Sequence, residues 1–218
     1  MAGEDLKQKI REGESITSAG VAITATPSDL EAIVAGGPVD LFRVDCQHGP
    51  YSEIHLVELC QAAKALDVPV GIRMKHNRLA FLIGVILDLG PLLIQVPQVE
   101  DEETVDEALN AFYYSPVGRR GWGGTAQTRY GLEGHEDQDA YVEYWNTHGV
   151  LMIQLESVNA ITNARHLAKP GVDAIAFGPN DLKLDLKRYP DHPFKTPEEC
   201  IAHVEEQLKG SDVRVGLS

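Results

Sequence analysis

The chain has 218 residues, 43% of them hydrophobic, and no stretch rich in Pro, Ser or Gly divides it, so we expect one domain over residues 1–218. Its net charge of −14 repels phosphate backbones and anionic lipids, which argues against nucleic acid and membrane surfaces as partners. No secretory signal is visible, and the longest apolar run, residues 79–89, is interrupted by Gly84 and Asp88. We therefore expect no membrane span and a cytoplasmic protein.

Short apolar runs alternate along the chain with longer segments of helical period. The runs are apolar on both faces, which is typical of strands in a parallel sheet covered by helices. Helices are expected between them, with clear apolar stripes at residues 53–66, 102–112 and 161–168. The expected strands are residues 18–25, 39–44, 68–74, 92–96, 150–155, 172–177 and 213–217.

Two further helices are predicted from their first residues. The segments 26–29 (Thr-Pro-Ser-Asp) and 196–199 (Thr-Pro-Glu-Glu) each place Thr at the N-cap, Pro at the first helical position and an acid at the third. This order satisfies the free N–H groups at the start of a helix.

Seven βα units suit either a (β/α)₈ barrel or a doubly wound open sheet. A dinucleotide-binding sheet needs glycines directly after its first strand, but residues 24–28 contain none. Polar residues instead collect at the carboxyl ends of the predicted strands, where barrel enzymes carry their active sites. These residues are Asp45, Gln47, His48, Arg73, Gln154, Glu156, Asn180 and Asp181. We therefore predict a (β/α)₈ TIM barrel that is truncated after strand 7.

The spacing of two acids suggests a metal site. Gln154 and Glu156 are two apart on a strand and leave it on the same face, while Asp181 follows the neighbouring strand, about 5 Å away. Oxygen ligands favour Mg²⁺, Mn²⁺ or Co²⁺ over zinc. The alternative is that each acid only caps a following helix.

Other polar residues are candidates for catalysis. Arg73 can clamp a carboxylate or an enolate oxygen, or it can simply pair with Asp88. Asp45 lies three residues before His48, where its carboxylate can orient an imidazole for proton transfer. The glycine-rich loop 118–124 can cradle an anion with its amides, although such a loop alone is a weak signal.

Five segments resemble the HpcH/HpaI aldolase family, the class II metal-dependent pyruvate aldolases that act on 2-keto-3-deoxy sugar acids or 4-hydroxy-2-oxo diacids. The resemblance runs from about residue 16 to 218. The segments are 44–50 (VDCQHGP), 71–73 (GIR), 114–121 (YSPVGRRG), 154–156 (QLE) and 177–182 (FGPNDL).

The resemblance implies a barrel of the phosphoenolpyruvate/pyruvate-binding type and a role for each matching residue. Glu156 and Asp181 would hold the divalent metal, Arg73 would stabilise the enolate, and His48 with Asp45 would transfer protons. The keto acid would be bound by Arg73, Gln154, Gly178, Pro179, Asn180 and Asp181. We also count Asp88 among the expected catalytic residues.

Two departures from the family pattern bear on this reading. Gln47 stands where many members carry Glu. Barrels of this kind usually run to about 250 residues, so the final strand, its flanking helices and the C-terminal helix that subunits exchange would be missing here. The resemblance implies a homo-oligomer, a trimer or a hexamer.

The sequence is compatible with three functions. The first is an aldolase that reversibly cleaves a 4-hydroxy-2-oxo acid to pyruvate and an aldehyde through a metal-stabilised pyruvate enolate. The second is a citrate-lyase-type enzyme acting on CoA esters, or an oxaloacetate decarboxylase. The third is a noncatalytic binding protein derived from an aldolase.

Overall fold

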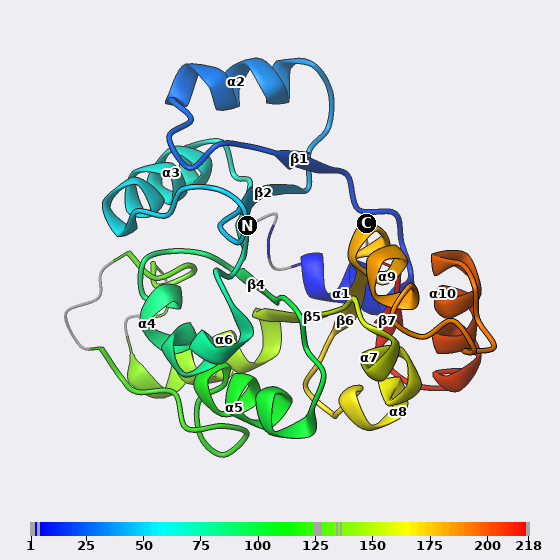
Figure 1. The fold of residues 1–218 in the computed structure, drawn as a ribbon. Coiled ribbons are helices and arrows are strands. Elements are labelled where there is room, and N and C mark those ends of the chain that lie inside the picture. The colour runs from blue at the N-terminus through cyan, green and yellow to red at the C-terminus, as the bar shows by residue number, and fades with distance from the viewer. Residues whose placement is uncertain (1–2, 4, 124–127, 134, 136, 217–218) are drawn as a thin grey trace.

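A computed structural model describes residues 3, 5–123, 128–133, 135 and 137–216 of the protein (Figure 1). Within them, seven parallel strands form one sheet in the order β1 to β7, so each strand is hydrogen bonded to the next along the chain. The strands are β1 (Ser18–Gly20), β2 (Leu41–Asp45), β3 (Val70–Arg73), β4 (Leu93–Val96), β5 (Val150–Leu155), β6 (Ala174–Phe177) and β7 (Arg214–Val215). The predicted barrel-type fold is confirmed, and β7 is the last strand of the described sheet.

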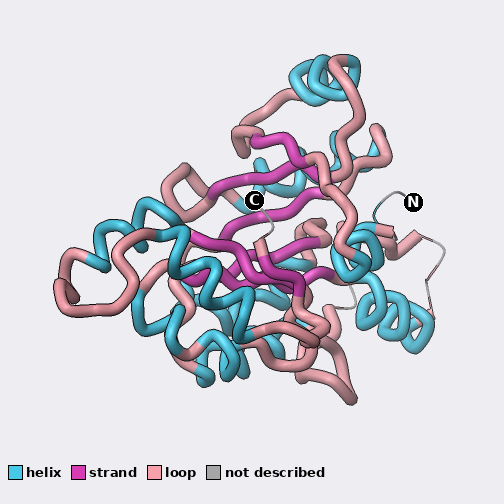
Figure 2. Tube along the Cα trace, turned by 90° about the vertical axis from the view of Figure 1, so that its right-hand side faces the viewer, coloured by secondary structure: helices cyan, strands magenta, loops and turns pink. Residues whose placement is uncertain are grey.

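Helices alternate with the strands and lie outside the curled sheet (Figures 1 and 2). The described helices are α1 (Leu6–Glu12), α2 (Pro27–Ala35), α3 (Glu53–Ala65), the 3₁₀ helix η2 (Asn77–Leu82), α4 (Ile83–Leu87), α5 (Glu102–Phe112), α6 (Gln138–His148), α7 (Val158–Thr162), α8 (Ala164–Leu167), α9 (Pro179–Leu186) and α10 (Pro197–Gln207). None of them is long and apolar enough to cross a membrane.

Several predicted boundaries differ from the observed ones by one or two residues, and three elements differ in a way that bears on the fold. The helix expected at 161–168 is two short helices, α7 and α8, which meet at Asn163. The first strand stops at Gly20, short of the expected residue 25, and β7 covers only two residues of the segment 213–217, of which residue 217 lies outside the described part. Both shortened strands lie at the edges of the sheet, where only one neighbour supports the strand.

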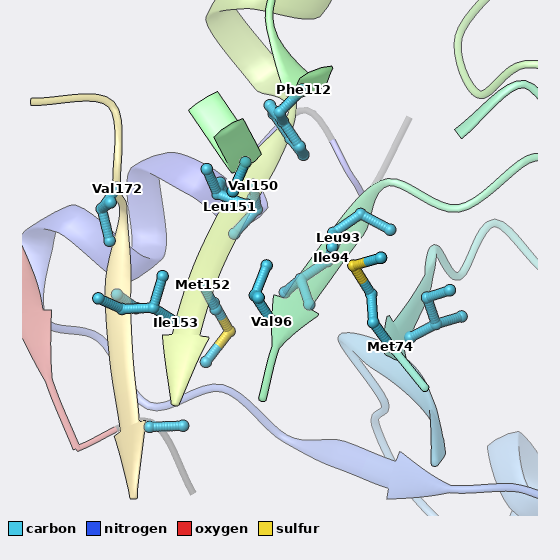
Figure 3. Packing of buried hydrophobic residues seen from close by; sticks show 14 of the residues in the cluster. Met74, Leu93, Ile94, Val96, Phe112, Val150, Leu151, Met152, Ile153 and Val172 are labelled. Carbon is cyan, nitrogen blue, oxygen red and sulfur yellow. The ribbon is translucent and has the colours of Figure 1, made fainter. Parts of the chain in front are cut away.

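The core is built on the central strands. Every residue of β4 and β5 is buried, because helices cover one face and the barrel interior covers the other. Figure 3 shows the side chains of Leu93, Ile94, Val96, Leu151 and Ile153 packed along these two strands. This packing holds the strand ends in place.

Both predicted helix starts are confirmed. Thr26 at the start of α2 and Thr196 at the start of α10 accept a hydrogen bond from the third helical residue, and the acids Asp29 and Glu199 bond back to the N-cap amide. Each is a complete capping box.

Helix α1 closes the amino-terminal end of the strands, which the sequence did not predict. Its buried Lys7 donates to the carbonyl of Gly149, just before β5, at 2.8 Å and to the hydroxyl of Tyr113 at 3.1 Å. The Lys7 ammonium also lies 3.3 Å from the fully buried carboxylate of Asp173, just before β6. The opposite end of the sheet, where the strands finish, is therefore the open one.

Candidate active site

Register brings Asp45 and Arg73 together at the carboxyl ends of β2 and β3, where they are paired residues. Arg73 Nε donates to Asp45 Oδ1 at 2.9 Å and Nη2 donates to Oδ2 at 2.5 Å. Two parallel hydrogen bonds of this kind fix the plane of the guanidinium. The predicted alternative, a pair between Arg73 and Asp88, is not what the structure contains.

The carboxylate of Asp45 does not orient the imidazole of His48, in contrast to the expectation. Its Oδ1 accepts the backbone N–H groups of Gln47 at 3.0 Å and of His48 at 3.4 Å, which shapes the turn after β2. Partial burial acts to raise the pKa of Asp45, but the hydrogen bond and charge of Arg73 outweigh it and hold this pKa below its usual value. Asp45 is thus an ionised partner of Arg73, and His48 is an exposed residue of the same turn.

The side-chain amides of Gln95 and Gln154 form a chain that connects Arg43 and Arg73 to Glu156. Gln95 Nε2 donates to Gln154 Oε1 at 2.6 Å, and Gln154 Nε2 donates to Glu156 Oε2 at 2.8 Å. Arg43 Nη2 donates to Gln95 Oε1 at 2.9 Å, while Arg73 Nη1 reaches Gln154 Oε1 at 3.4 Å. Since every amide both donates and accepts, the chain fixes which way each one points.

Arg43 and Gln95 were not predicted from the sequence. Both are polar residues inside otherwise apolar strand segments, which was the available signal. Gln98 was not predicted either, and its backbone N–H donates to Glu156 Oε1 at 3.0 Å. Gln98 adopts φ 51°, a conformation that side-chain-bearing residues seldom take, so the loop after β4 is held in a strained form beside Glu156.

Glu156 and Asp181 line one cavity of about 280 Å³, as predicted from their positions after β5 and β6. Burial first, and the Asp181 charge second, raise the pKa of Glu156. Neither carboxylate has a cationic side chain within ion-pair distance among the described residues. Arg188 also lines this cavity but pairs with Asp185 at 3.6 Å. Two converging acids without an ion-pair partner of their own among the described residues fit a divalent cation.

The set of ligands that the protein offers is small. The described residues contain no group of three or more His, Cys, Asp and Glu side chains placed to hold a metal. Mg²⁺ and similar ions are often bound by one or two carboxylates, with water and substrate oxygens completing the shell. Glu156 and Asp181 fit that arrangement.

Gly178 leaves room for the side chain of Glu156. A Cβ atom at this position would overlap the Glu156 carboxylate and would meet Glu156 Cβ at 2.7 Å and Gln154 Nε2 at 3.0 Å. Gly178 is also the N-cap of α9, with Pro179 at its first position and Asp181 in its first turn. The first turn of α9 therefore begins directly beside the Glu156 side chain.

Comparison with known proteins identifies the scaffold. The sequence pattern of the HpcH/HpaI aldolase/citrate lyase family matches residues 22–204. The chain belongs to the HpcH/HpaI aldolase/citrate lyase family. It is 30% identical over 204 residues to a 4-hydroxy-2-oxovalerate aldolase of Novosphingobium aromaticivorans, covering 91% of this chain and 75% of that protein.

Two further proteins agree with this assignment. A 2-keto-3-deoxy-L-rhamnonate aldolase of Klebsiella pneumoniae is 32% identical over 194 residues, which is 86% of this chain and 69% of that protein. The crystal structure of an HpcH/HpaI aldolase from Desulfitobacterium hafniense superposes with a TM-score of 0.79 at 28% identity, over 96% of this chain and 80% of that one. As a member of this family of aldolases, the protein is a carbon–carbon lyase.

In this HpcH/HpaI family member, Asp88 does not reach the cavities around Arg73 and Glu156. It caps the C-terminal end of α4, which leads into the amino-terminal end of β4, whereas the other site residues lie at the carboxyl ends of the strands. The Asp88 carboxylate accepts a hydrogen bond from Arg120 Nη2 at 2.7 Å. A catalytic role for Asp88 remains a prediction that this single chain does not support.

The first three residues of the glycine-rich loop do not offer the expected anion cradle. The amides of Gly118, Arg119 and Arg120 donate to the carbonyls of Tyr114, Asn110 and Tyr113, at 3.0, 2.7 and 2.9 Å. Amides that are already bonded cannot bind an anion. Residue 124 of the predicted loop lies outside the described residues.

Proposed function

We propose that the protein is a metal-dependent aldolase that reversibly cleaves a 4-hydroxy-2-oxo acid to pyruvate and an aldehyde. The observation that carries this proposal is the convergence of Glu156 and Asp181 on one cavity, next to an amide chain that reaches Arg73. Relatives named as aldolases of 2-oxo acids support it.

Glu156 and Asp181 would hold the cation, which we infer to be Mg²⁺, Mn²⁺ or Co²⁺. When bound, this cation supplies Lewis-acid stabilisation of negative charge on the keto oxygen. The Gln98 amide and the Gln154 side chain each hold one oxygen of Glu156, so the carboxylate is already oriented.

Arg73 would stabilise the same developing charge. Asp45 fixes its guanidinium by two hydrogen bonds, so little reorganisation is needed during the reaction. Gln154 would position the keto acid, and the amides of Asn180 and Asp181 in the first turn of α9 would receive its carboxylate.

The reaction balances without an added oxidant or reductant. In the cleavage direction the C4 hydroxyl loses its proton, the C3–C4 bond breaks, and its electron pair stays on C3 as the enolate of pyruvate. C3 then takes a proton, which gives pyruvate. We assign proton transfer to His48, whose exposed side chain follows Asp45.

Metal dependence is tested by binding and by turnover. The protein is stripped with EDTA and assayed for pyruvate release from 4-hydroxy-2-oxo acids, before and after Mn²⁺ is added back, while Mn²⁺ binding is followed separately by electron paramagnetic resonance. We expect Glu156→Gln to lose both Mn²⁺ binding and turnover, and the control Glu31→Gln on the exposed surface of α2 to keep both. Full activity in the stripped protein would contradict the proposal.

The name of the family includes citrate lyase, so a second candidate is a lyase of CoA esters or an oxaloacetate decarboxylase. The net charge of −14 does not favour the phosphates of CoA. Oxaloacetate and a citryl-type CoA ester therefore belong in the substrate panel, and faster turnover of either than of any hydroxy-oxo acid would select this candidate.

We further propose that the protein is a cytoplasmic homo-oligomer.

A further inference from the structure

A cavity of about 360 Å³ lies inside the curl of the sheet, on the inner side of Asp45 and Arg73. Its polar lining includes Ser18, Arg43, Gln95 and Gln154, from four different strands. Arg43 and Asp45 are two apart on β2 and face the same side, so Arg43 lies one layer deeper in the barrel. This volume is at the lower end of the range for small-molecule sites.

The charge in this cavity is not balanced. Arg43 and Arg73 contribute two guanidinium groups, whereas Asp45 is the acid that lines it, and both Asp45 oxygens are already bonded to Arg73. Within the part of the chain that the structure describes, the guanidinium of Arg43 has one hydrogen bond, to the neutral amide of Gln95, and no carboxylate within ion-pair distance. Burial, and then the Arg73 charge, lower the pKa of Arg43, and the Asp45 charge offsets this only in part.

We propose that this cavity is a subsite for a second carboxylate group, with Arg43 as the residue that selects it. The subsite would bind the carboxylate of an acidic aldehyde, or the distal carboxylate of the hydroxy-oxo acid that yields it. The planar fork of Arg43 suits a carboxylate, and the ligand would supply the negative charge that the described residues do not. This inference rests on the proposed aldolase function and adds a substrate class to it.

The position of Arg43 connects the subsite to the reacting centre. Through Gln95 and Gln154, its guanidinium is linked by consecutive hydrogen bonds to Glu156. A purely structural role is a weaker explanation, because a leucine would fill the same position in an otherwise apolar strand without burying a charge. The amide chain needs only a donor at this point, not a guanidinium.

A binding experiment tests the subsite without any turnover. Malonate is titrated into metal-free protein by isothermal calorimetry, and we expect Arg43→Leu to weaken its Kd by at least about tenfold. Arg43→Lys keeps the charge and should recover part of the affinity, which also guards against a folding defect in the leucine variant. The control Arg78→Leu removes an exposed guanidinium from η2 and should leave the Kd unchanged. Equal malonate affinity in wild type and both Arg43 variants, or no measurable binding in wild type, would overturn the proposal.

A selectivity experiment separates this proposal from the proposed function. Aldol addition of pyruvate is measured with glyoxylate, which carries a carboxylate, and with glycolaldehyde, which has the same number of carbons and no charge. We expect the ratio of kcat/KM for glyoxylate over glycolaldehyde to fall about tenfold or more in Arg43→Leu and to stay constant in Arg78→Leu. An unchanged ratio in an active Arg43→Leu enzyme would refute the subsite, whereas no addition with either aldehyde in wild type would refute the aldolase function and leave the malonate result to decide on Arg43.

Discussion

At the scale of single residues, the site is organised around shared hydrogen bonds more than around isolated side chains. Asp45 serves the turn after β2 and the guanidinium of Arg73 at once, and Gln154 joins the arginines to Glu156. Because such groups act as a unit, removing one should disturb the geometry of the others. Arg73 is the member that links both parts.

We predict that Arg73→Ala lowers kcat/KM by about 10²–10³-fold, because a preorganised positive charge at the developing oxyanion is lost. Arg73→Lys should restore only part of this, since a point charge cannot make both hydrogen bonds to Asp45. Steady-state pyruvate release measures the effect, with Arg78→Ala as the control. Wild-type turnover in Arg73→Ala would remove Arg73 from the mechanism.

At the scale of the elements, capping decides where two helices begin. We predict that Thr26→Ala and Thr196→Ala each lower the free energy of unfolding by about 1 kcal/mol, because each capping box loses its hydroxyl acceptor. Thr147→Ala in the last turn of α6 is the matched control, since its hydroxyl only bonds back to the carbonyl of Glu143. Urea titrations followed by circular dichroism should give the control a higher free energy of unfolding than both cap variants. The reverse order would contradict the capping assignment.

Helix α1 carries two lysines with acidic partners in very different surroundings. The side chain of Lys7 is 6% exposed and its partner Asp173 is fully buried, whereas the side chains of Lys9 and Asp40 are 35% and 26% exposed. Burial lowers the pKa of Lys7 despite the Asp173 charge, while the hydrogen bond to Asp40 raises that of Lys9. The two pairs should therefore contribute differently to stability.

We predict that Lys7→Met lowers the free energy of unfolding by about 3 kcal/mol, because it leaves the buried Asp173 carboxylate with only partial compensation. Lys9→Met should cost less than about 1 kcal/mol, as expected for an exposed pair. Urea titrations followed by circular dichroism measure the free energy of unfolding of both variants. Equal destabilisation by both substitutions would show that the Lys7 contact does not anchor α1 to the barrel.

At the scale of the whole molecule, the described sheet has two free edges. The outer side of β1 and that of β7 pair with no other described strand. On β7 the amides of Arg214 and Gly216 donate to Asp173 and Ile175 of the β6 segment at 3.0 Å, so the amide of Val215 points away from the sheet. Free strand edges of this kind promote association.

We predict that the 218-residue chain associates with itself through the free edges of β1 and β7. Light scattering after size exclusion should give a multiple of 23.9 kDa, and Val215→Pro should shift the chain toward the monomer because it removes the free edge donor. Val215→Ala keeps that donor and serves as the control. A wild-type monomer that melts at the same temperature as a C-terminally extended chain would contradict this prediction.

The sequence by itself determined the order of strands, the helix caps and the positions of the polar strand ends. These depend on local periodicity and short spacing. The apolar runs predicted the seven strands, and the spacing of Glu156 and Asp181 predicted that the two acids lie close together. Contacts between distant segments do not appear in a local pattern. The tertiary structure therefore decided that Asp45 bonds Arg73 and not the ring of His48, and that Asp88 caps a helix beside Arg120.

The same distinction explains the residues that were missed. Arg43 and Gln95 looked like exceptions within buried strands, because their partners come from neighbouring strands that only folding brings alongside. The interior cavity, its excess of positive charge and the free edges of the sheet are likewise properties of the curled sheet as a whole. Strand register determines which side chains lie next to each other across the sheet, and register depends on packing across the entire barrel.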